Sequence, residues 1–363
     1  MRHLIDFSDL TQREWQHLYH RFEDILEHPG DYRDALRGQT LASLFYEPST
    51  RTRLSFEAAM QRLGGGVFGF SDPMASSVAK GETLKDTVIM VTGYSDAMVM
   101  RHPCEGAALA ASLFSARPVI NAGDGCHCHP TQTLTDLAAI TRLFGGVDGL
   151  RIGLCGDLKY GRTIHSLLTA LCRFGGVKVT LVSVPELALP AYAKRACDAA
   201  GIQVAEEPDL RSAIGDLDIL YMTRVQRERF ADPAEYERLK DRVILTPDIL
   251  SGARKDMRIM HPLPRAGEID MEVDRDPRAV YFEQARLGMV IRMALLLEMC
   301  RLPSFTPAYI RDDTESGRHT NSGRTPSQAV LRCPNLSCIT HKEPYLPLPA
   351  GDGVCRYCDS SLT

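Results

Sequence analysis

LASLFYEPSTRTR, residues 41–53, reads as a strand, a loop and the start of a helix. Its first six residues, 41–46, form the nearly continuous apolar run that is typical of a short buried strand. A helix is expected to begin near Thr52 and to end at the three glycines of residues 64–66. The polar residues 47–53 therefore lie in a loop between a strand and a helix.

The same alternation of strand and helix continues along the chain. Apolar runs predict further strands at residues 96–100, 118–121, 150–155, 177–184, 219–222 and 243–245. Helical periodicity, and a capping box at Thr11 and Glu14, predict helices at 11–26, 134–144, 163–174, 191–200 and 284–300. Such alternation produces parallel sheets with helices on both faces. We therefore predict an α/β fold of two doubly wound parallel-sheet domains.

The length of the chain leaves room for more than these two domains. At 363 residues it exceeds what one ordinary core accommodates. We predict a first domain over residues 1–140 and a second over 141–302, with the helix near 284–300 returning to the first. Residues 303–331 are polar and have no apolar period, which predicts a flexible linker. Residues 332–363 are too few to hold a core unaided.

Composition excludes several classes of protein. Hydrophobic residues make up 44% and charged residues 24%, so the chain is neither wholly disordered nor fibrous. The net charge of −4 supplies no global basic field that would recruit nucleic acid or an anionic membrane. No apolar run approaches the ~18 residues of a membrane span, and the first residues lack a secretory signal. We expect a soluble, cytoplasmic protein without a nucleic-acid or membrane partner.

The cysteines indicate a metal site near the C-terminus. Seven of the eleven are scattered in apolar settings, and the other four are Cys333, Cys338, Cys355 and Cys358. An odd total without regular spacing argues against a secreted disulfide scaffold. Two pairs separated by a loop suit a tetrahedral zinc ion held by four thiolates, so we predict a small four-cysteine zinc ribbon. His341 as a substitute ligand, or four unrelated thiols on a disordered tail, are the alternatives.

The polar loop at residues 47–53 suits an oxyanion such as phosphate. It combines hydroxyls, two guanidinium groups and the free N–H groups of a helix start. A polar helix cap with solvated arginines is the alternative. Similar groups follow other strands, in Arg101-His102-Pro103 and His129-Pro130-Thr131-Gln132. Because ligands of open α/β sheets bind beyond the carboxyl ends of strands, we expect these three loops to converge.

Seven motifs together identify a family. They are Ser49-Thr50-Arg51-Thr52-Arg53, Lys80-Gly81-Glu82-Thr83, Arg101-His102-Pro103, His129-Pro130-Thr131-Gln132, Asp157-Leu158-Lys159-Tyr160-Gly161-Arg162-Thr163, Arg224-Val225-Gln226 and His261-Pro262-Leu263-Pro264-Arg265. Over residues 1–302 their order resembles that of aspartate carbamoyltransferase catalytic chains. The resemblance implies transfer of a carbamoyl group from carbamoyl phosphate to L-aspartate, which gives N-carbamoyl-L-aspartate and phosphate. This is the committed step of de novo pyrimidine (UMP) biosynthesis.

The resemblance also implies which residues hold carbamoyl phosphate. The phosphate would be bound by Ser49, Thr50, Arg51, Thr52 and Arg101, with Ser76 and Lys80. The carbamoyl oxygen would be polarised by Thr52, Arg101 and His129. Gln132 would bind the carbamoyl NH2, and the backbone carbonyls of Pro262 and Leu263 would orient the amino groups. The catalytic set would be Arg51, Thr52, Lys80, Arg101, His129 and Gln132.

Aspartate would be held by a second set of residues. By resemblance these are Lys80, Arg162, Thr163, Arg224, Gln226 and Leu263. The residue chemistry agrees, since Arg forks suit planar carboxylates and phosphate oxygens. We expect direct attack by the uncharged amine, catalysed by positioning and by stabilisation of the tetrahedral oxyanion. The departing phosphate is the expected proton acceptor. His129 as general base is the rival, although Arg51 and Arg101 would bias it towards a neutral hydrogen-bond donor.

Ser76 and Lys80 lie in residues 71–81, a loop that in the family reaches into the neighbouring subunit's active site. The resemblance therefore implies a homotrimer, or a multiple of trimers, with shared active sites. A surface loop with one solvated lysine is the alternative. The sequence departs from the family here, because Ala79 stands where a second lysine is common.

Other enzyme classes fit less well. Residues 153–157 invite a dinucleotide-binding interpretation but lack the full glycine motif. Ornithine or another amino-acid carbamoyltransferase is the closer rival, yet ornithine enzymes carry Ser-Met-Gly and His-Cys-Leu-Pro motifs, and Arg224 would repel an ornithine side chain. Cys126 and Cys128 flank His127, but their spacing is poor for a tetrahedral site, so we interpret them as variable loop residues.

The sequence of residues 333–344 resembles part of the zinc domain of the separate regulatory chain of two-chain aspartate carbamoyltransferases. There the zinc domain docks on catalytic chains and helps to bridge trimers. We expect a structural zinc ion here and no cofactor for catalysis. The sequence does not support a built-in CTP or ATP site, because the nucleotide-binding part of the regulatory chain is absent. A clamp between neighbouring subunits is favoured over a module that binds another protein or nucleic acid, and the balanced charges of residues 332–363 disfavour binding to phosphate backbones. The sequence leaves open the number of trimers, any cooperativity, and whether a separate regulatory chain or a dihydroorotase-type partner associates. It also leaves open whether the zinc domain docks on its own or on a neighbouring subunit.

Overall fold

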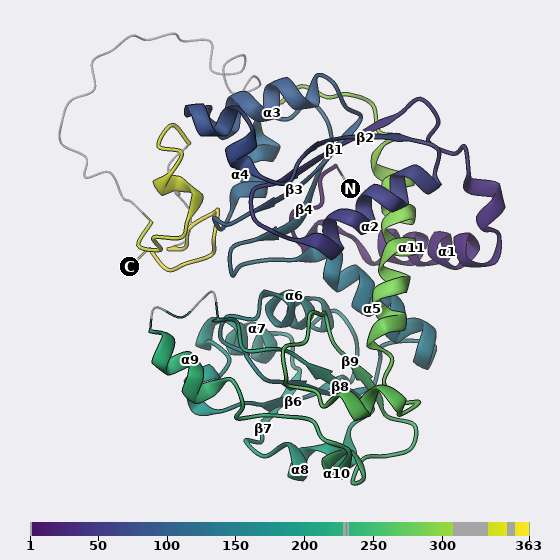
Figure 1. The fold of residues 1–363 in the computed structure, drawn as a ribbon, viewed down its shortest axis with the longest axis vertical. Helices are drawn as coiled ribbons and strands as arrows, with labels where there is room; N and C mark the ends of the chain where they lie inside the picture. Colours follow the sequence, from purple (N-terminus) through teal and green to yellow (C-terminus); the bar gives the residue numbers. More distant parts are fainter. Residues whose placement is uncertain (1, 228–229, 231, 308–332, 347–352, 363) are drawn as a thin grey trace. The chain divides into compact units, whose positions relative to one another are not determined.

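The computed structural model describes residues 2–227, 230, 232–307, 333–346 and 353–362 (Figure 1). The predicted linker therefore lies outside the described residues from position 308 onwards. The chain divides into two compact units, Met1–Thr131 with Met289–Thr363, and Gln132–Gly288. Among the described residues, every helix is too short or too polar to cross a lipid bilayer.

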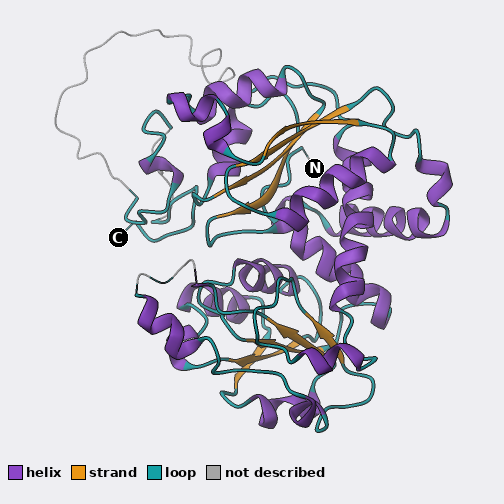
Figure 2. Ribbon diagram, viewed as in Figure 1, coloured by secondary structure: helices purple, strands orange, loops and turns teal. Residues whose placement is uncertain are grey.

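The first unit is built on a four-stranded parallel sheet with the strand order β2-β1-β3-β4 (Figure 2). Its strands are β1 (Thr40–Phe45), β2 (Gly66–Phe70), β3 (Ala97–His102) and β4 (Val119–Asp124). The helices α1 (Gln12–Glu27), α2 (Thr50–Arg62), α3 (Leu84–Thr92) and α4 (Ala107–Phe114) flank it. Thr11 and Glu14 form the predicted capping box at the start of α1. Figure 1 shows α3 and α4 on one face of the sheet and α2 on the other.

The second unit is built on a five-stranded parallel sheet with the order β7-β6-β5-β8-β9. The strands are β5 (Arg151–Cys155), β6 (Lys178–Val182), β7 (Gln203–Glu206), β8 (Ile219–Met222) and β9 (Arg258–Met260). The helices are α5 (Pro130–Phe144), α6 (Arg162–Leu171), α7 (Ala191–Ala199), α8 (Leu210–Ala213), α9 (Pro233–Leu239), α10 (Pro247–Leu250) and the first part of α11 (Tyr281–Met299). Two parallel α/β sheets confirm the predicted fold class.

One predicted strand is wrong. Residues 243–245 form no strand, and Leu245 makes only an isolated bridge with Ile269. Pro247 starts α10 two residues later, which leaves too little extended chain for a ladder, and β9 occupies the sheet position beside β8. Three strands were not predicted. β2 contains two glycines and β7 is mostly exposed, so neither presents an apolar run, and β9 has only three residues.

The carboxyl ends of β1, β3 and β4 lie at one edge of the first sheet. Between β3 and β4 the register shifts, because Met100 pairs with Asn121 but His102 pairs with Asp124. β4 therefore contains one extra residue opposite Arg101. This is a β-bulge, which can redirect side chains at the rim of a sheet. The irregularity falls at the end of β3 where an anion-binding loop is predicted.

The described residues between 333 and 362, here called the tail, pack on the first unit of the same chain. Ile339, Leu346 and Tyr357 are buried in one apolar cluster with residues of α3 and α4. In Figure 1 the tail is the yellow segment beside α4. Burial of these side chains supplies the core that so short a segment lacks on its own.

Candidate active site

The loop between β1 and α2 presents backbone donors and hydroxyls at a helix start. Ser49 is the N-cap residue of α2, but its hydroxyl does not cap the helix. Thr50 and Arg51 are exposed, whereas Thr52 in the first turn is buried. The first N–H groups of a helix lack partners within the helix and favour an anion. This arrangement is compatible with a phosphate site at this loop, which stays a prediction.

Arg101 at the end of β3 is tied to the β1–α2 loop. Its Nε donates to Oε1 of Glu47 over 2.8 Å, and Nη2 lies 2.7 Å from the same oxygen. Both side chains are mostly buried, at 13% and 16% exposed. Glu47 therefore orients the guanidinium of Arg101 and joins two of the three strand ends at which anion-binding loops are predicted.

The third strand end leads to His129, which is buried just before α5. The hydroxyl of Thr131 lies 3.4 Å from Nδ1 of His129. The preceding loop, residues 124–128, is organised by the fully buried Asp124. This carboxylate accepts hydrogen bonds from the backbone N–H of Gly106 over 2.7 Å and of Cys128 over 3.1 Å. Burial acts to raise the pKa of Asp124, but His127 and the hydrogen-bond donors outweigh it and hold that pKa below its usual value.

Asp124, His127 and Cys128 also bring potential metal-ligand atoms within 4.8 Å of one another. Nδ1 of His127 already lies 3.1 Å from Asp124, and burial raises the pKa of Cys128 to about 12. The oxygens of Asp124 also accept from the N–H groups of Gly106 and Cys128. The cluster is thus a hydrogen-bonded loop that leads into His129.

Ser76 and Lys80 lie in two short turns between β2 and α3. The Ser76 hydroxyl donates to the carbonyl of Pro73 over 2.7 Å and accepts from the N–H of Val78 over 3.3 Å. These local bonds shape the turn Ser77–Lys80, and Lys80 at its end is exposed. The hydroxyl is used locally, while the ammonium group faces solvent.

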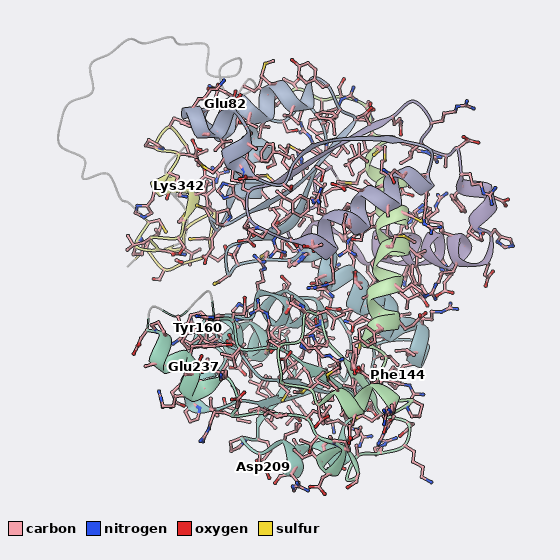
Figure 3. All side chains as sticks on the ribbon, viewed as in Figure 1. Glu82, Phe144, Tyr160, Asp209, Glu237 and Lys342 are labelled. Carbon is pink, nitrogen blue, oxygen red and sulfur yellow. The ribbon has the colours of Figure 1, made fainter. Side chains whose placement is uncertain are left out.

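In the second unit the loops after β5 and β8 are joined to each other. Asp157 accepts from the N–H of Tyr160 over 2.9 Å and from the N–H of Gln226 over 3.2 Å. The Gln226 side chain donates to the carbonyl of Tyr160 over 2.8 Å, and Figure 3 labels Tyr160 in this loop. Arg162 starts α6 and is buried, while Arg224 is partly exposed in the loop after β8. Two predicted aspartate-binding residues, Arg162 and Thr163, thus start α6 directly after the β5 loop, and two others, Arg224 and Gln226, lie in the connected loop after β8.

Gln132 in the first turn of α5 belongs to a buried polar network. Its amide donates to Oδ1 of Asp136 over 2.8 Å, and the same oxygen accepts from the amide of Gln284 over 2.6 Å. The other oxygen of Asp136 accepts from the hydroxyl of Tyr221 over 2.8 Å. Burial, with the nearby Asp136, raises the pKa of Tyr221 well above its usual value, so the phenol remains a donor.

The same network reaches the loop after β9. The carbonyl oxygen of the Gln284 side chain accepts from the N–H of His261 over 2.9 Å. Nδ1 of His261 accepts from the N–H of Leu263 over 2.7 Å, and Nε2 lies 2.6 Å from Glu268. Leu263 has a φ of 56°, a conformation that non-glycine residues adopt at a cost and that recurs at ligand clamps. Asp136 and Gln284 therefore connect Gln132 to the backbone of Leu263.

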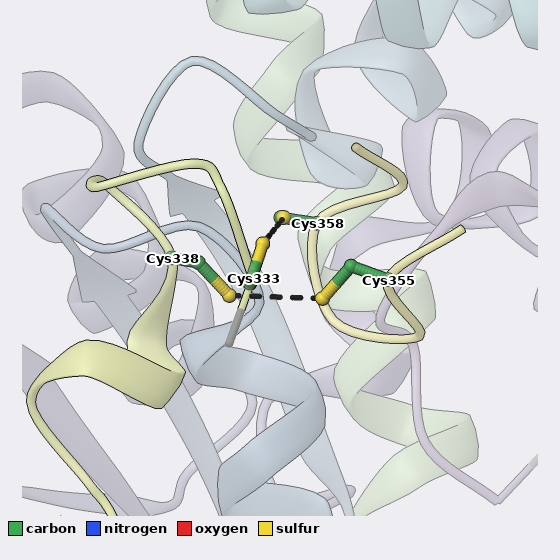
Figure 4. Close-up of side chains that lie close together, drawn as sticks. All are labelled: Cys333, Cys338, Cys355 and Cys358. Atoms are coloured by element: carbon green, nitrogen blue, oxygen red, sulfur yellow. Dashed lines mark hydrogen bonds between the residues drawn. The ribbon is translucent and has the colours of Figure 1, made fainter. Parts of the chain in front are cut away.

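The four tail cysteines converge on one point (Figure 4). All four are buried, and their sulfurs lie within 4.8 Å of one another. The Sγ–Sγ distances are 3.5 Å for Cys333–Cys358 and 3.8 Å for Cys338–Cys355. Four sulfurs at about 2.3 Å from a tetrahedral zinc ion are separated by about 3.8 Å. His341 hydrogen-bonds the carbonyl of Cys333 over 2.8 Å, so it supports the segment that carries this cysteine.

Comparison with known proteins identifies the family. Residues 2–142 match the model of the aspartate/ornithine carbamoyltransferase carbamoyl-P binding domain, and residues 148–299 match that of the Asp/Orn binding domain. The chain belongs to the aspartate/ornithine carbamoyltransferase family. A relative in Clostridium perfringens named aspartate carbamoyltransferase catalytic subunit is 52% identical over 299 residues, which are 82% of this chain and 97% of that protein.

Solved structures of this family have the same fold. The catalytic subunit of M. jannaschii aspartate transcarbamoylase matches with a TM-score of 0.76 and 46% identity, covering 82% of this chain and 98% of that one. The Trypanosoma cruzi enzyme in complex with carbamoyl phosphate and aspartate matches with a TM-score of 0.78 and 38% identity, covering 82% and 96%. Both family models end by residue 299, so the tail lies beyond them.

Proposed function

We propose that this chain is an aspartate carbamoyltransferase that converts carbamoyl phosphate and L-aspartate to N-carbamoyl-L-aspartate and phosphate. The observation that carries the proposal is 52% identity, over 82% of the chain, to a protein named aspartate carbamoyltransferase catalytic subunit. The T. cruzi relative, whose structure holds carbamoyl phosphate and aspartate, supports the same substrates. The reaction would serve pyrimidine biosynthesis.

The first unit supplies most of the groups proposed for carbamoyl phosphate, and Gln132, Pro262 and Leu263 come from the second. Residues Ser49–Thr52 would bind the phosphate through hydroxyls, N–H groups and the Arg51 guanidinium, and the bond from Glu47 supports a fixed orientation of Arg101. Arg101, Thr52 and His129 would polarise the carbamoyl oxygen. Gln132, held by Asp136, would bind the carbamoyl NH2, and the backbone carbonyls of Pro262 and Leu263 would orient the amino groups.

The second unit supplies most of the groups proposed for aspartate, and Lys80 comes from the first. Arg162, Thr163, Arg224 and Gln226 would hold its two carboxylates, together with Lys80 and Leu263. Bidentate guanidinium groups suit carboxylates. Arg224 would repel the ammonium group of ornithine, which favours aspartate over the other substrate in the family's name.

The chemistry follows from positioning. The uncharged amine of aspartate attacks the carbamoyl carbon, and a tetrahedral intermediate forms with its oxyanion facing Arg101, Thr52 and His129. The C–O bond to phosphate then breaks, and phosphate leaves with the proton of the amine. Donors fixed before reaction stabilise developing charge without reorganisation, and each contributes about 10²–10³ in rate.

The test is product formation from carbamoyl phosphate with either amino acid. We expect N-carbamoyl-L-aspartate from aspartate and a rate with ornithine at least about 10³-fold lower, since an unpaired buried charge is costly to bind. Arg224→Ala should raise the KM for aspartate about 100-fold and leave the KM for carbamoyl phosphate nearly unchanged. Formation of citrulline from ornithine at a comparable rate would overturn the proposal.

We also propose that Cys333, Cys338, Cys355 and Cys358 hold one structural zinc ion. Their burial and sulfur spacing support a tetrahedral ion. Elemental analysis should find one zinc per chain, and the paired replacement Cys355→Ser/Cys358→Ser should abolish it. Retention of full zinc in that variant would exclude these ligands.

The third part of the proposal is a homotrimer, or a multiple of trimers, with active sites shared between subunits. Exposure of Lys80 is compatible with its use by a neighbour. Mixing inactive Arg51→Ala and Lys80→Ala chains should then restore part of the activity, because some sites receive neither substitution. Native mass spectrometry of the same mixture shows whether the chains exchanged. Exchanged oligomers without recovered activity would rule out sharing.

A further inference from the structure

We propose that the tail acts within its own chain as a brace that positions the two loops leading to Arg101 and His129. The loops, each counted from the last residues of its strand, are residues 101–106 at the end of β3 and residues 124–129 at the end of β4. The inference rests on the proposed roles of Arg101 and His129 in binding carbamoyl phosphate. It assigns to the tail a part in substrate binding that a clamp between subunits would not have.

Glu105 is the first point of contact. Its backbone N–H donates to the carbonyl of Ser337 over 3.0 Å, and its carbonyl accepts from the N–H of Ile339 over 2.9 Å. One side-chain oxygen accepts from the amide of Asn335 over 2.6 Å, and the other from the N–H of Cys126 over 3.4 Å. A single residue, four positions from Arg101, therefore joins the tail to both loops.

His127 is the second point of contact. Nδ1 lies 3.1 Å from Asp124 and Nε2 lies 3.0 Å from Asp359 of the tail. The imidazole thus connects the tail to the buried carboxylate that also accepts from Gly106 and Cys128. Since His127 is two residues from His129, displacement of the tail would loosen the segment that places the His129 ring.

Close packing makes the tail contact specific. Gly106 has a φ of +78°, and a Cβ at this position would lie 2.4 Å from the carbonyl oxygen of Tyr357. Tyr357 is itself buried. A larger residue at position 106 would force the tail away from the loop, so the contact depends on a specific backbone fit as well as on apolar burial.

Further contacts anchor the tail on α3. The carboxylate of Glu343 accepts from the N–H of Leu84 over 3.1 Å, and the hydroxyl of Tyr345 accepts from the N–H of Lys85 over 2.9 Å. Both donors belong to the first turn of α3, where N–H groups lack partners within the helix. Figure 3 labels Lys342 on this part of the tail. The tail is therefore held at α3 as well as at the two loops, which a brace requires.

The experiment breaks the two loop contacts from the tail side in the full chain. Asn335→Ala removes the amide that Glu105 accepts from, and Asp359→Gly removes the carboxylate that faces His127. Glycine is chosen because residue 359 has a φ of 57°. Asp359→Asn, which keeps a hydrogen-bond acceptor, is the conservative variant. Leu336→Ala, at a side chain 84% exposed on the same tail, is the matched control.

We combine these two substitutions in the double variant Asn335→Ala/Asp359→Gly. It should raise the KM for carbamoyl phosphate about three- to tenfold, with little change in the KM for aspartate at saturating carbamoyl phosphate. Hydrogen exchange at the amides of Cys126 and Cys128 should accelerate by at least about tenfold. Asp359→Asn should lie closer to the parent, and Leu336→Ala should match it. Oligomer mass and zinc content should not change.

Unchanged KM and unchanged exchange in the double variant would overturn the brace. A rise in KM that appears only with a change in oligomer mass would overturn it too, because the tail would then act through assembly. Glu105→Ala breaks the link from the loop side and should give the same exchange signature if the double variant folds poorly. Arg101→Ala separates the two proposals: if it leaves carbamoyl phosphate binding intact, the proposed site fails, whatever the tail does.

Discussion

The loops with proposed substrate-binding residues are supported differently in the two units. In the second unit, Gln132 and the backbone of Leu263 are connected through Asp136, Gln284 and His261, all buried within that unit. In the first unit, the loops beyond Arg101 and before His129 make hydrogen bonds with the tail, more than 200 residues away in sequence.

Loops at the ends of similar parallel strands can therefore be held in position in different ways. A buried polar network is rigid when every member is satisfied, but it fails when one partner is removed. A docked segment contributes only while it is itself folded. We therefore expect single substitutions in the second unit's network to affect stability, and loss of the tail to affect substrate binding.

The largest expected effect comes from Arg101, at the centre of the first unit's loops. Arg101→Ala should lower kcat/KM by about 100- to 1,000-fold, because it removes a fixed donor to the developing oxyanion. Steady-state kinetics measure this. Arg117→Ala, at an arginine in the same unit that pairs with Asp96 over 3.7 Å, is the control and should be nearly silent. A loss smaller than about tenfold for Arg101→Ala would remove Arg101 from the catalytic set.

The next effect tests the second unit's network. Asp136→Ala leaves three donors, from Gln132, Tyr221 and Gln284, without their buried acceptor. The free energy of unfolding should fall by about 3 kcal/mol, measured by denaturant titration. Tyr221→Phe removes one donor and its bond and should cost only about 1 kcal/mol. Equal stability of Asp136→Ala and the parent chain would mean that the network does not hold this unit.

Removal of the proposed zinc ion tests the first unit's dependence on the tail. A chelator should unfold the four-cysteine cluster and raise the KM for carbamoyl phosphate about three- to tenfold, as in the double variant. Added zinc should restore the original value. The KM for aspartate serves as the internal control, because the second unit is supported by its own residues. A chelated enzyme with unaltered KM would show that the loops need no docked tail.

The smallest expected effect is a pH dependence of the free energy of unfolding that comes from His102, the last residue of β3. Burial lowers the pKa of His102 to about 4, so the folded chain keeps it neutral while the unfolded chain binds a proton below about 6.5. The unfolded state then holds more protons, and stability falls as pH decreases from 6.5 towards 4. The contribution is about 1 kcal/mol per pH unit over that range.

The substitution His102→Asn isolates the contribution of His102 to the pH dependence of stability. Asn supplies an acceptor for the N–H of Cys104, which Nδ1 of His102 binds over 2.9 Å, but it does not titrate. The decline in unfolding free energy between pH 6.5 and 5 should be about 1.5 kcal/mol smaller in His102→Asn. Parallel pH curves for the two proteins would exclude His102 as a source of the dependence.

The sequence predicted what depends on local pattern. Apolar runs predicted β1 and β5, the capping box at Thr11 predicted the start of α1, and cysteine spacing predicted the buried quartet. Residues 243–245 misled because an apolar run looks the same whether or not a neighbouring strand completes its ladder. Pro247 two residues later was the available signal against a strand.

The supporting residues of both units escaped sequence reasoning. Glu105 meets Asn335 across 230 positions, and Gln284 meets Asp136 across 148, so no local spacing announces either contact. Glu47 stood inside the quoted loop, but a carboxylate next to predicted anion-binding groups gave no hint that it orients Arg101. Gly106 carries a conformational signal only once its φ and the position of Tyr357 are known.

The most direct test of the central claim, that both units serve one carbamoyl transfer to aspartate, is calorimetric titration with N-(phosphonacetyl)-L-aspartic acid. This compound, bound in one T. cruzi structure, joins a phosphonate and an aspartate in one molecule. We predict one site per chain, weakened at least about 100-fold by Arg101→Ala and, separately, by Arg224→Ala. Absence of binding to the parent chain, or binding that either variant leaves unchanged, would contradict the account.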